Sequence, residues 1–202
     1  MFFFNYSTLV DPFLRHVRLY AVRFSGLKVG DRVLDVCCGT GDQVYHYARA
    51  GLLATGIDLD PAMLRLAAKD KRGRVLDNAS FRLADARWLP FTDNSFDGAS
   101  VSLALHEKER DVRDEVISEM KRVVRPGGAL IIIDYQVPLP KKRLSRLVGT
   151  VEFIAGRQHY RCFKDYLAQG GLDVLLAKNR LTAANRDYLA GGLITIVKIL
   201  NP

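Results

Sequence analysis

The sequence predicts an α/β fold, in which a mostly parallel sheet of seven strands carries helices on both faces. Short apolar runs alternate along the chain with segments of helical periodicity, and residues that begin or end helices separate them. Strands that alternate with helices build parallel sheets from strand–helix–strand units. Because no internal repeat or linker divides the 202 residues, we expect a single domain with one core.

Seven apolar runs are the expected strands. The last two are joined by RLTAANRDYLAG, which has no long helical pattern and is short for a parallel crossover. We therefore expect these two strands to pair antiparallel at the end of the sheet. The seven runs cover residues 32–37, 53–58, 80–85, 96–102, 128–135, 173–179 and 192–200.

Capping residues and spacing predict the helices. Asp11-Pro12 and Asp60-Pro61 each place a capping carboxylate before a proline, as is typical of a first helical turn. A further helix is expected to begin near Asp42. A repeat of four positions predicts another helix, which stops at Arg125–Gly128. Its apolar residues are Val112, Val116, Met120 and Val124.

Two more helices are expected in the segment 136–168. Residues 141–155 carry an apolar stripe with basic residues elsewhere, and a short helix is expected from about His159 to Ala168, ahead of Gly170-Gly171. The segment has seven basic and two acidic residues, which is most of the net charge of +8. An amphipathic basic helix suits an anionic membrane surface, although the same apolar stripe could instead cover the protein's own site.

The composition is that of a soluble globular protein. Hydrophobic residues make up 49% of the chain and charged residues 26%. No apolar run approaches the roughly 20 residues that cross a bilayer, and the start MFFFNYSTLVDP lacks the features of a signal peptide. We therefore expect a cytoplasmic location, with peripheral contact at the inner membrane face as a further option.

A glycine turn, LDVCCGTGDQ at residues 34–43, follows the first expected strand. Such a turn lets a ligand approach the backbone closely. The adjacent Cys37 and Cys38 belong to no CxxC pair and to no Cys/His cluster of zinc spacing. We interpret them as small residues that line a ligand loop, and we expect no metal. Val44 stands where a dinucleotide fingerprint has its third glycine, which argues against a nicotinamide cofactor.

Acidic residues accompany the first three expected strands. Asp35 lies inside the first, where it would repel a pyrophosphate and suit a positively charged ligand. Asp58 ends the second, 17 residues after Gly41, where a carboxylate can accept ribose hydroxyls. Asp85 ends the third, where it could accept an adenine amino group. Parallel strands bring these carboxylates to one edge of the sheet.

These motifs resemble those of the class I S-adenosylmethionine-dependent methyltransferases, and most closely the ubiquinone/menaquinone C-methyltransferase-like group. The resemblance rests on VLDVCCGTGD (33–42), GIDLDPAML (56–64), ADARWLPFTDNSFD (84–97) and EMKRVVRPGG (119–128). It implies a Rossmann-like fold, S-adenosylmethionine as cofactor and S-adenosylhomocysteine as product. It also implies a helical cap at residues 1–27 and a lid at 136–168 on the acceptor side.

The resemblance further implies which residues hold the cofactor. Asp35, Gly39 and Gly41 would hold the methionine part, with Cys37 at the place of the family's first glycine. Asp58 would bind the ribose. The remaining residues implied are Leu59 and Met63 beside the adenine, Asp85 and Ala86 at its edge, Ser102 and Leu103 below the sulfonium, and Tyr6 closing over the cofactor.

The acceptor is expected to be a small lipophilic or aromatic molecule, quinone-like or a phospholipid head group. The Gly-Leu-Arg-Asn motif of quinone methyltransferases is absent, and Ser102–Glu107, SLALHE, stands after the fourth strand instead. Two alternatives remain open: a nucleic-acid methyltransferase that uses the basic face, and a non-catalytic methyltransferase-like binding subunit. Candidate bases for an acceptor that must lose a proton are His106, Tyr135, His159 and Tyr160.

Overall fold

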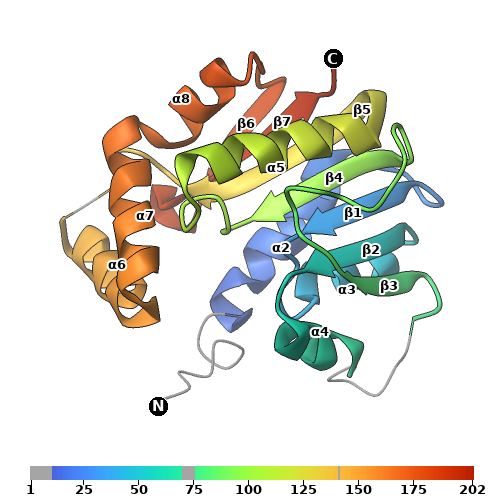
Figure 1. Ribbon diagram of the computed structural model, residues 1–202, viewed down its shortest axis with the longest axis horizontal. Coiled ribbons are helices and arrows are strands. Elements are labelled where there is room, and N and C mark those ends of the chain that lie inside the picture. Colours follow the sequence, from blue (N-terminus) through green and yellow to red (C-terminus); the bar gives the residue numbers. More distant parts are fainter. Residues whose placement is uncertain (1–10, 70–75, 141) are drawn as a thin grey trace.

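The computed structural model describes residues 11–69, 76–140 and 142–202. Its central sheet has seven strands in the order β3-β2-β1-β4-β5-β7-β6 (Figure 1). β1 to β5 run parallel, whereas β7 is antiparallel to both β5 and β6. This topology confirms the predicted α/β fold. The strands are β1 (Arg32–Val36), β2 (Leu53–Asp58), β3 (Ala79–Leu83), β4 (Phe96–Ser102), β5 (Val124–Tyr135), β6 (Asn185–Leu189) and β7 (Ile194–Leu200).

Alternating side chains of β5 supply both faces of the sheet, as expected for a strand. Leu130 and Ile132 are buried with α5 and α8, whereas Ile131 and Ile133 are buried with α2 on the opposite face. Figure 1 shows α3 on the same face as α2. The helices are α2 (Asp11–Ser25), α3 (Asp42–Arg49), α4 (Pro61–Ala68), α5 (Arg110–Val123), α6 (Lys142–Ala155), α7 (Arg157–Gln169) and α8 (Gly171–Lys178).

α7 closes the carboxyl end of the central strands. Its Tyr166 belongs to the apolar cluster on one face of the sheet, and its Phe163 belongs to the cluster on the other face. α6 packs beside α7 at the margin of the molecule, and its Val148 belongs to the same apolar cluster as Ile131 and Ile133 of β5 (Figure 1). The two helices occupy most of residues 136–168, the segment expected to be a lid.

The predicted strand at 173–179 is wrong, because this segment lies in α8. Leu172, Leu175 and Leu176 are buried at helical spacing, and Gly170 in the left-handed region precedes the helix. The strand that pairs with β7 is β6, inside the connection RLTAANRDYLAG. The antiparallel pair is therefore present, but its first member lies later in the chain than predicted.

Two of the predicted helix starts are confirmed, and α3 begins at Asp42. α2 is described from Asp11, the first described residue, so the cap at Asp11 stays a prediction. The Asp60 carboxylate accepts a hydrogen bond of 2.7 Å from the backbone of Ala62 and caps α4. None of the helices in the described ranges is long and apolar enough to cross a membrane.

Candidate functional site

A cavity of about 780 Å³ lies at the carboxyl ends of β1, β2, β3 and β4. This volume is within the range of pockets that bind small molecules and cofactors. α2 contributes Leu14 and Arg18 to its wall, and α7 contributes Gln158, His159 and Cys162. Ligands of open parallel sheets bind at this edge of the strands.

The glycine turn forms the base of the cavity. Gly39 has φ 53°, and a Cβ placed on it would meet nothing within 4 Å, so the residue faces open space. Gly41 serves a different purpose, because a Cβ placed on it would lie 2.6 Å from the Phe81 ring. Gly41 is not among the described residues that line the cavity. Gly39 therefore leaves room for a ligand, whereas Gly41 lets α3 pack against β3.

Cys37 and Cys38 both line the cavity, and neither forms a disulfide. Burial raises the pKa of Cys37 to about 12 and also raises that of Cys38. A Cβ on Gly56 would lie 2.8 Å from the Cys38 sulfur, so this side chain fills the space beside β2. Thiols that stay protonated at neutral pH are poor nucleophiles and poor metal ligands. The geometry supports their interpretation as lining residues.

Asp58 holds the turn and presents its carboxylate to the cavity. One oxygen accepts a hydrogen bond of 2.8 Å from the Gly39 amide, and the other accepts one of 2.9 Å from the Asp60 amide. Because each carboxylate oxygen can accept two hydrogen bonds, both keep a free position for a ligand. A pair of neighbouring hydroxyls, as in a ribose, matches this acceptor pair.

Asp35 and Gln43 form a buried acceptor corner of the same cavity. Asp35 is 3% exposed, and burial raises its pKa to about 7, although the Ser100 hydroxyl donates to it at 2.7 Å. The Gln43 amide nitrogen donates to the Arg18 carbonyl, but the Gln43 amide oxygen is buried and has no hydrogen-bond partner among the described residues. A buried acceptor without a donor costs stability. A ligand ammonium would supply the missing donors.

At the third strand, Asp85 is paired with Arg87. The guanidinium donates to both carboxylate oxygens, at 2.7 to 3.2 Å, and holds the pKa of Asp85 below its usual range. Ala86, Leu59 and Met63 line the cavity beside this pair. Asp85 is where the sequence places it, but its partner Arg87 was not foreseen, because nothing in the sequence distinguishes that arginine from a solvated one.

The cavity is also lined by Ser102 and Leu103 at the end of β4, and by Glu107 and His159. The His159 Nδ1 lies 3.3 Å from a Glu107 carboxylate oxygen, and the other oxygen lies 3.3 Å from the Lys108 ammonium. Of the four predicted bases, His159 is the one that lines the cavity. Sequence reasoning missed Glu107, because no pattern links it to a histidine more than fifty positions later.

The other candidate bases lie elsewhere. The His106 Nδ1 is 2.7 Å from Asp134, its Nε2 is 3.5 Å from Glu152, and the Tyr135 hydroxyl donates to Glu152 at 3.0 Å. Tyr160 packs its ring against Phe153. None of the three is among the described residues that line the cavity, and Tyr6 lies outside the described ranges.

The buried position of His106 also opposes a role as base. Burial alone lowers its pKa, but the carboxylates of Asp134 and Glu152 outweigh this effect and raise it to about 10. A histidine that is already protonated at neutral pH cannot accept a proton. Since Asp134 is in β5 and Glu152 in α6, the network instead fastens α6 to the sheet.

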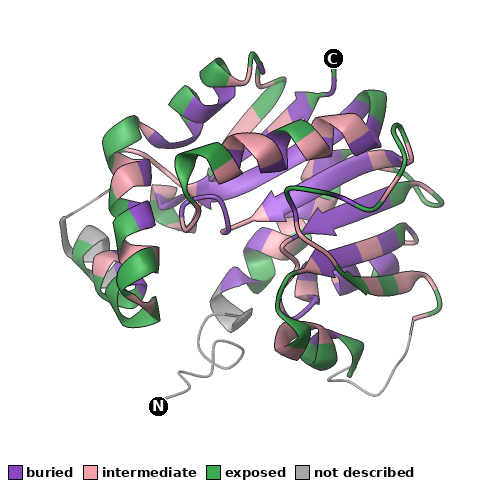
Figure 2. Ribbon diagram, viewed as in Figure 1, coloured by how far each residue is buried: buried purple, intermediate pink, exposed green. Residues whose placement is uncertain are grey.

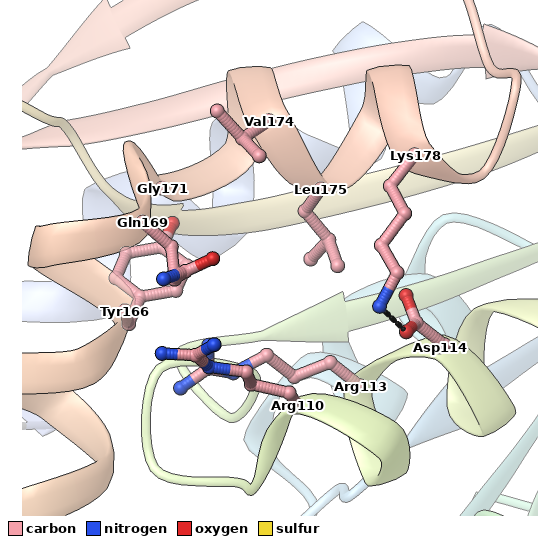
Figure 3. A pocket seen from close by; sticks show the side chains of 9 residues that line it. All are labelled: Arg110, Arg113, Asp114, Tyr166, Gln169, Gly171, Val174, Leu175 and Lys178. Atoms are coloured by element: carbon pink, nitrogen blue, oxygen red, sulfur yellow. Dashed lines mark hydrogen bonds and ion pairs between the residues drawn. The ribbon is translucent and has the colours of Figure 1, made fainter.

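A second pocket, of about 40 Å³, lies between α5, α7 and α8 (Figure 3). It is too small for a cofactor. Arg110 and Arg113, which line it, bind Asp165 of α7, and Lys178 of α8 pairs with Asp114 of α5. The cations of this pocket thus connect the three helices.

The chain is similar to known methyltransferases. Residues 33–128 match the family model described as "Methyltransferase domain". The ubiquinone/menaquinone biosynthesis C-methyltransferase UbiE of Pseudomonas putida (strain GB-1) is 35% identical over 143 residues, which are 66% of this chain and 53% of that protein. UbiE of Pseudomonas aeruginosa (strain LESB58) is 35% identical over 59% of this chain and 47% of its own. The chain thus spans about half the length of these curated relatives.

Solved structures share the fold. A SAM-dependent methyltransferase from Aquifex aeolicus superposes with a TM-score of 0.69 at 19% identity, over 92% of this chain and 89% of its own. Phosphoethanolamine N-methyltransferase 2 of Haemonchus contortus, solved in complex with S-adenosyl-L-methionine, gives 0.69 at 17% identity, over 93% of this chain and 52% of its own. At such identities the likeness shows the fold alone.

Proposed function

We propose that this chain, which carries a class I S-adenosylmethionine-dependent methyltransferase domain, transfers a methyl group from S-adenosylmethionine to a small lipophilic aromatic acceptor of the quinol type. The observation that carries the proposal is the lining of the cavity. It combines Asp35, Asp58 and the open face of Gly39 with apolar residues and with the pair of His159 and Glu107. The relatives named as quinone C-methyltransferases support this class of acceptor.

The acidic residues of the cavity fit the cofactor. Asp58 would accept the two ribose hydroxyls, and Asp85 with Ala86 would contact the adenine edge. Asp35 and the unpaired Gln43 oxygen would accept from the ammonium of the methionine part. When bound, S-adenosylmethionine supplies a methyl group on a sulfonium, which is the electrophile of the reaction.

Beside the cofactor, the chain would orient the acceptor and exclude water. Leu14, Leu103 and Ala104 contribute apolar wall, which suits a ring that leaves water. His159, beside the Glu107 carboxylate, would accept the proton of a ring hydroxyl. The ionised ring would accept the methyl group on carbon and then lose the proton of that carbon. His159 would return its own proton to the ring oxygen, so one proton is released overall.

The experiment is calorimetric titration with S-adenosylmethionine and S-adenosylhomocysteine, and with NADH as the control ligand. We expect both sulfur compounds to bind and NADH not to bind. Asp58→Ala is expected to weaken binding by about tenfold or more, because it removes charged acceptors of two hydroxyls. Asp77→Ala, which removes an exposed carboxylate before β3, is the matched control. Failure of both sulfur compounds to bind would overturn the proposal.

Acceptors are then compared under the same conditions with quinols, simple phenols, phosphoethanolamine and RNA. We expect methylation of quinols and phenols. Methylation of RNA alone or phosphoethanolamine alone would contradict the acceptor class while leaving the cofactor in place. Cofactor binding with no methylation in the whole panel would favour a non-catalytic binding subunit.

A further inference from the structure

The outer side of α6 is unusually apolar for a surface helix. Val148 and Glu152, one turn apart, are buried, so this side faces the protein. On the sides of α6 that face away from the protein, Val151, Phe153 and Ile154 are 45%, 61% and 55% exposed. Figure 2 shows exposed residues along this helix, at the margin of the molecule. Large apolar side chains gathered on one exposed element mark an interaction surface.

The charge around this surface is of one sign. Of the two acidic residues in α6 and α7, Glu152 is buried in the network with His106, and Asp165 is bound by two arginines of α5. Arg146 of α6 and Arg157 and Lys164 of α7 are exposed, and within the described part of the chain they have no carboxylate partner. The surface therefore presents apolar side chains and cations without a free carboxylate.

We propose that this surface, defined by Arg146, Val151, Phe153, Ile154 and Arg157, docks on an anionic lipid bilayer. Apolar side chains enter the boundary between head groups and acyl chains, while cations near the surface are attracted by anionic lipid. An acidic protein would also attract the cations. Three large apolar side chains beside arginines without a carboxylate partner in the described ranges fit a bilayer better, because a bilayer places charged head groups directly above an apolar interior.

Docking would bring the cavity to the lipid. The helix that packs against α6 is α7, and its residues Gln158, His159 and Cys162 line the cavity. A lipophilic acceptor would then leave the bilayer beside the wall that holds His159. The transfer of an acceptor from the bilayer to the cavity rests on the proposed function, whereas the binding to lipid does not.

The test is co-sedimentation of the full chain with phosphatidylcholine vesicles that contain or lack phosphatidylglycerol. We expect binding to the anionic vesicles, little binding to the neutral ones, and weakening by salt. The double variant Phe153→Ser/Ile154→Ser is expected to lose about tenfold or more in affinity. Its matched control is Val29→Ser/Leu200→Ser, which removes two apolar side chains that are 81% and 54% exposed. Both lie at the end of the sheet where β1 and β5 begin. The control is expected to bind like the unaltered chain.

A second pair of variants tests the charges. Arg146→Glu/Arg157→Glu is expected to abolish binding to anionic vesicles, whereas Lys28→Glu/Arg49→Glu, with the same change in net charge away from α6, should retain most of it. Circular dichroism shows that each variant is folded. Absence of binding by the unaltered chain, or equal losses in variants and controls, would overturn the proposal.

Two further measurements separate this proposal from the proposed function. The α6 variants should bind S-adenosylhomocysteine and methylate a water-soluble phenol as the unaltered chain does. If the unaltered chain binds vesicles but neither binds the cofactor nor methylates, the docking surface stands and the proposed function fails. If it methylates but never binds vesicles, the reverse holds.

Discussion

Asp35 is the residue at which burial and the proposed binding of the cofactor oppose each other. Burial raises its pKa to about 7, so that it is largely protonated in mildly acidic solution. Binding of an ammonium group favours the ionised carboxylate. The proposed cofactor site therefore couples binding to the release of a proton from Asp35.

We expect the affinity for S-adenosylhomocysteine to rise roughly tenfold between pH 6 and pH 8, because the ionised fraction of a group with this pKa rises by about that factor. Calorimetry in buffers of different ionisation enthalpy measures the affinity and the released protons together. Asp35→Asn should bind weakly at all pH values and release no proton on binding. A pH-independent affinity in the unaltered chain would contradict this role.

Cys37 occupies a backbone conformation that favours glycine. Its φ of 57° is in the left-handed region, which costs a residue with a Cβ about 1–2 kcal/mol. Cys37→Gly relieves this strain but increases the entropy of the unfolded chain by about 0.5–1 kcal/mol. We therefore expect the free energy of unfolding in urea to rise by up to about 1 kcal/mol.

The adjacent cysteine provides the control. Cys38 is not in the left-handed region, and its side chain fills the space beside Gly56 and Val44. Cys38→Gly should therefore lower the free energy of unfolding by about 1–3 kcal/mol, through lost packing. Equal effects of the two substitutions would show that strain at Cys37 does not matter.

At the scale of elements, α6 is fastened to the sheet by a buried histidine. The raised pKa of His106 means that the folded protein holds a proton more tightly than the unfolded chain, whose histidine has a pKa near 6.5. The stabilisation is thus complete below about pH 6.5 and disappears as pH rises toward 10.

We expect the free energy of unfolding to fall by about 2 kcal/mol more in the unaltered chain than in His106→Gln between pH 7 and pH 9. Urea unfolding at several pH values measures it, and the difference between the two proteins removes the contribution of other titrating groups. His16→Gln, which replaces an exposed histidine of α2, should behave as the unaltered chain. Parallel pH profiles for His106→Gln and the unaltered chain would refute the fastening role.

Elements that combine a hydrophobic pattern with capping residues could be predicted from the sequence. The strands that carry Asp35 and Asp58 and the helix α4, which Asp60 caps, are of this kind. The C-terminal part was misread because DVLLAKN is a short apolar run that suits a strand or a buried helix equally. β6, an edge strand with the sequence NRDYL, carries almost no apolar signal.

The residues of the site also divide into those that a sequence pattern could place and those that it could not. Residues at strand ends could be placed from the sequence, because topology alone brings Asp58 and Asp85 to one edge. Side-chain partnerships such as His159 with Glu107, or His106 with Glu152, depend on how α6 and α7 cover that edge. No local pattern encodes such a packing, so the sequence could not separate a buried histidine from one that faces the cavity.

At the scale of the whole molecule, the cavity wall is assembled from distant parts of the chain. α2 contributes Arg18, the loop after β1 contributes Gly39, the end of β2 contributes Asp58, and α7 contributes His159. A ligand that contacts these elements together stabilises the folded state as a unit, since the unfolded chain has no such site.

We expect S-adenosylhomocysteine at about 100 times its dissociation constant to raise the melting temperature by about 5–10 °C, from roughly 2.7 kcal/mol of linked stability. Gly39→Leu should abolish this rise, because the new side chain projects into open cavity at a φ of 53°. Gly127→Leu is the matched control. Gly127 has a φ of 74° and equally open surroundings, but it lies near the start of β5, away from the strand ends that line the cavity. Both variants carry similar backbone strain and should melt below the unaltered chain without ligand. The control alone should keep the ligand-induced rise, and a rise retained in Gly39→Leu would place the cofactor outside the glycine turn.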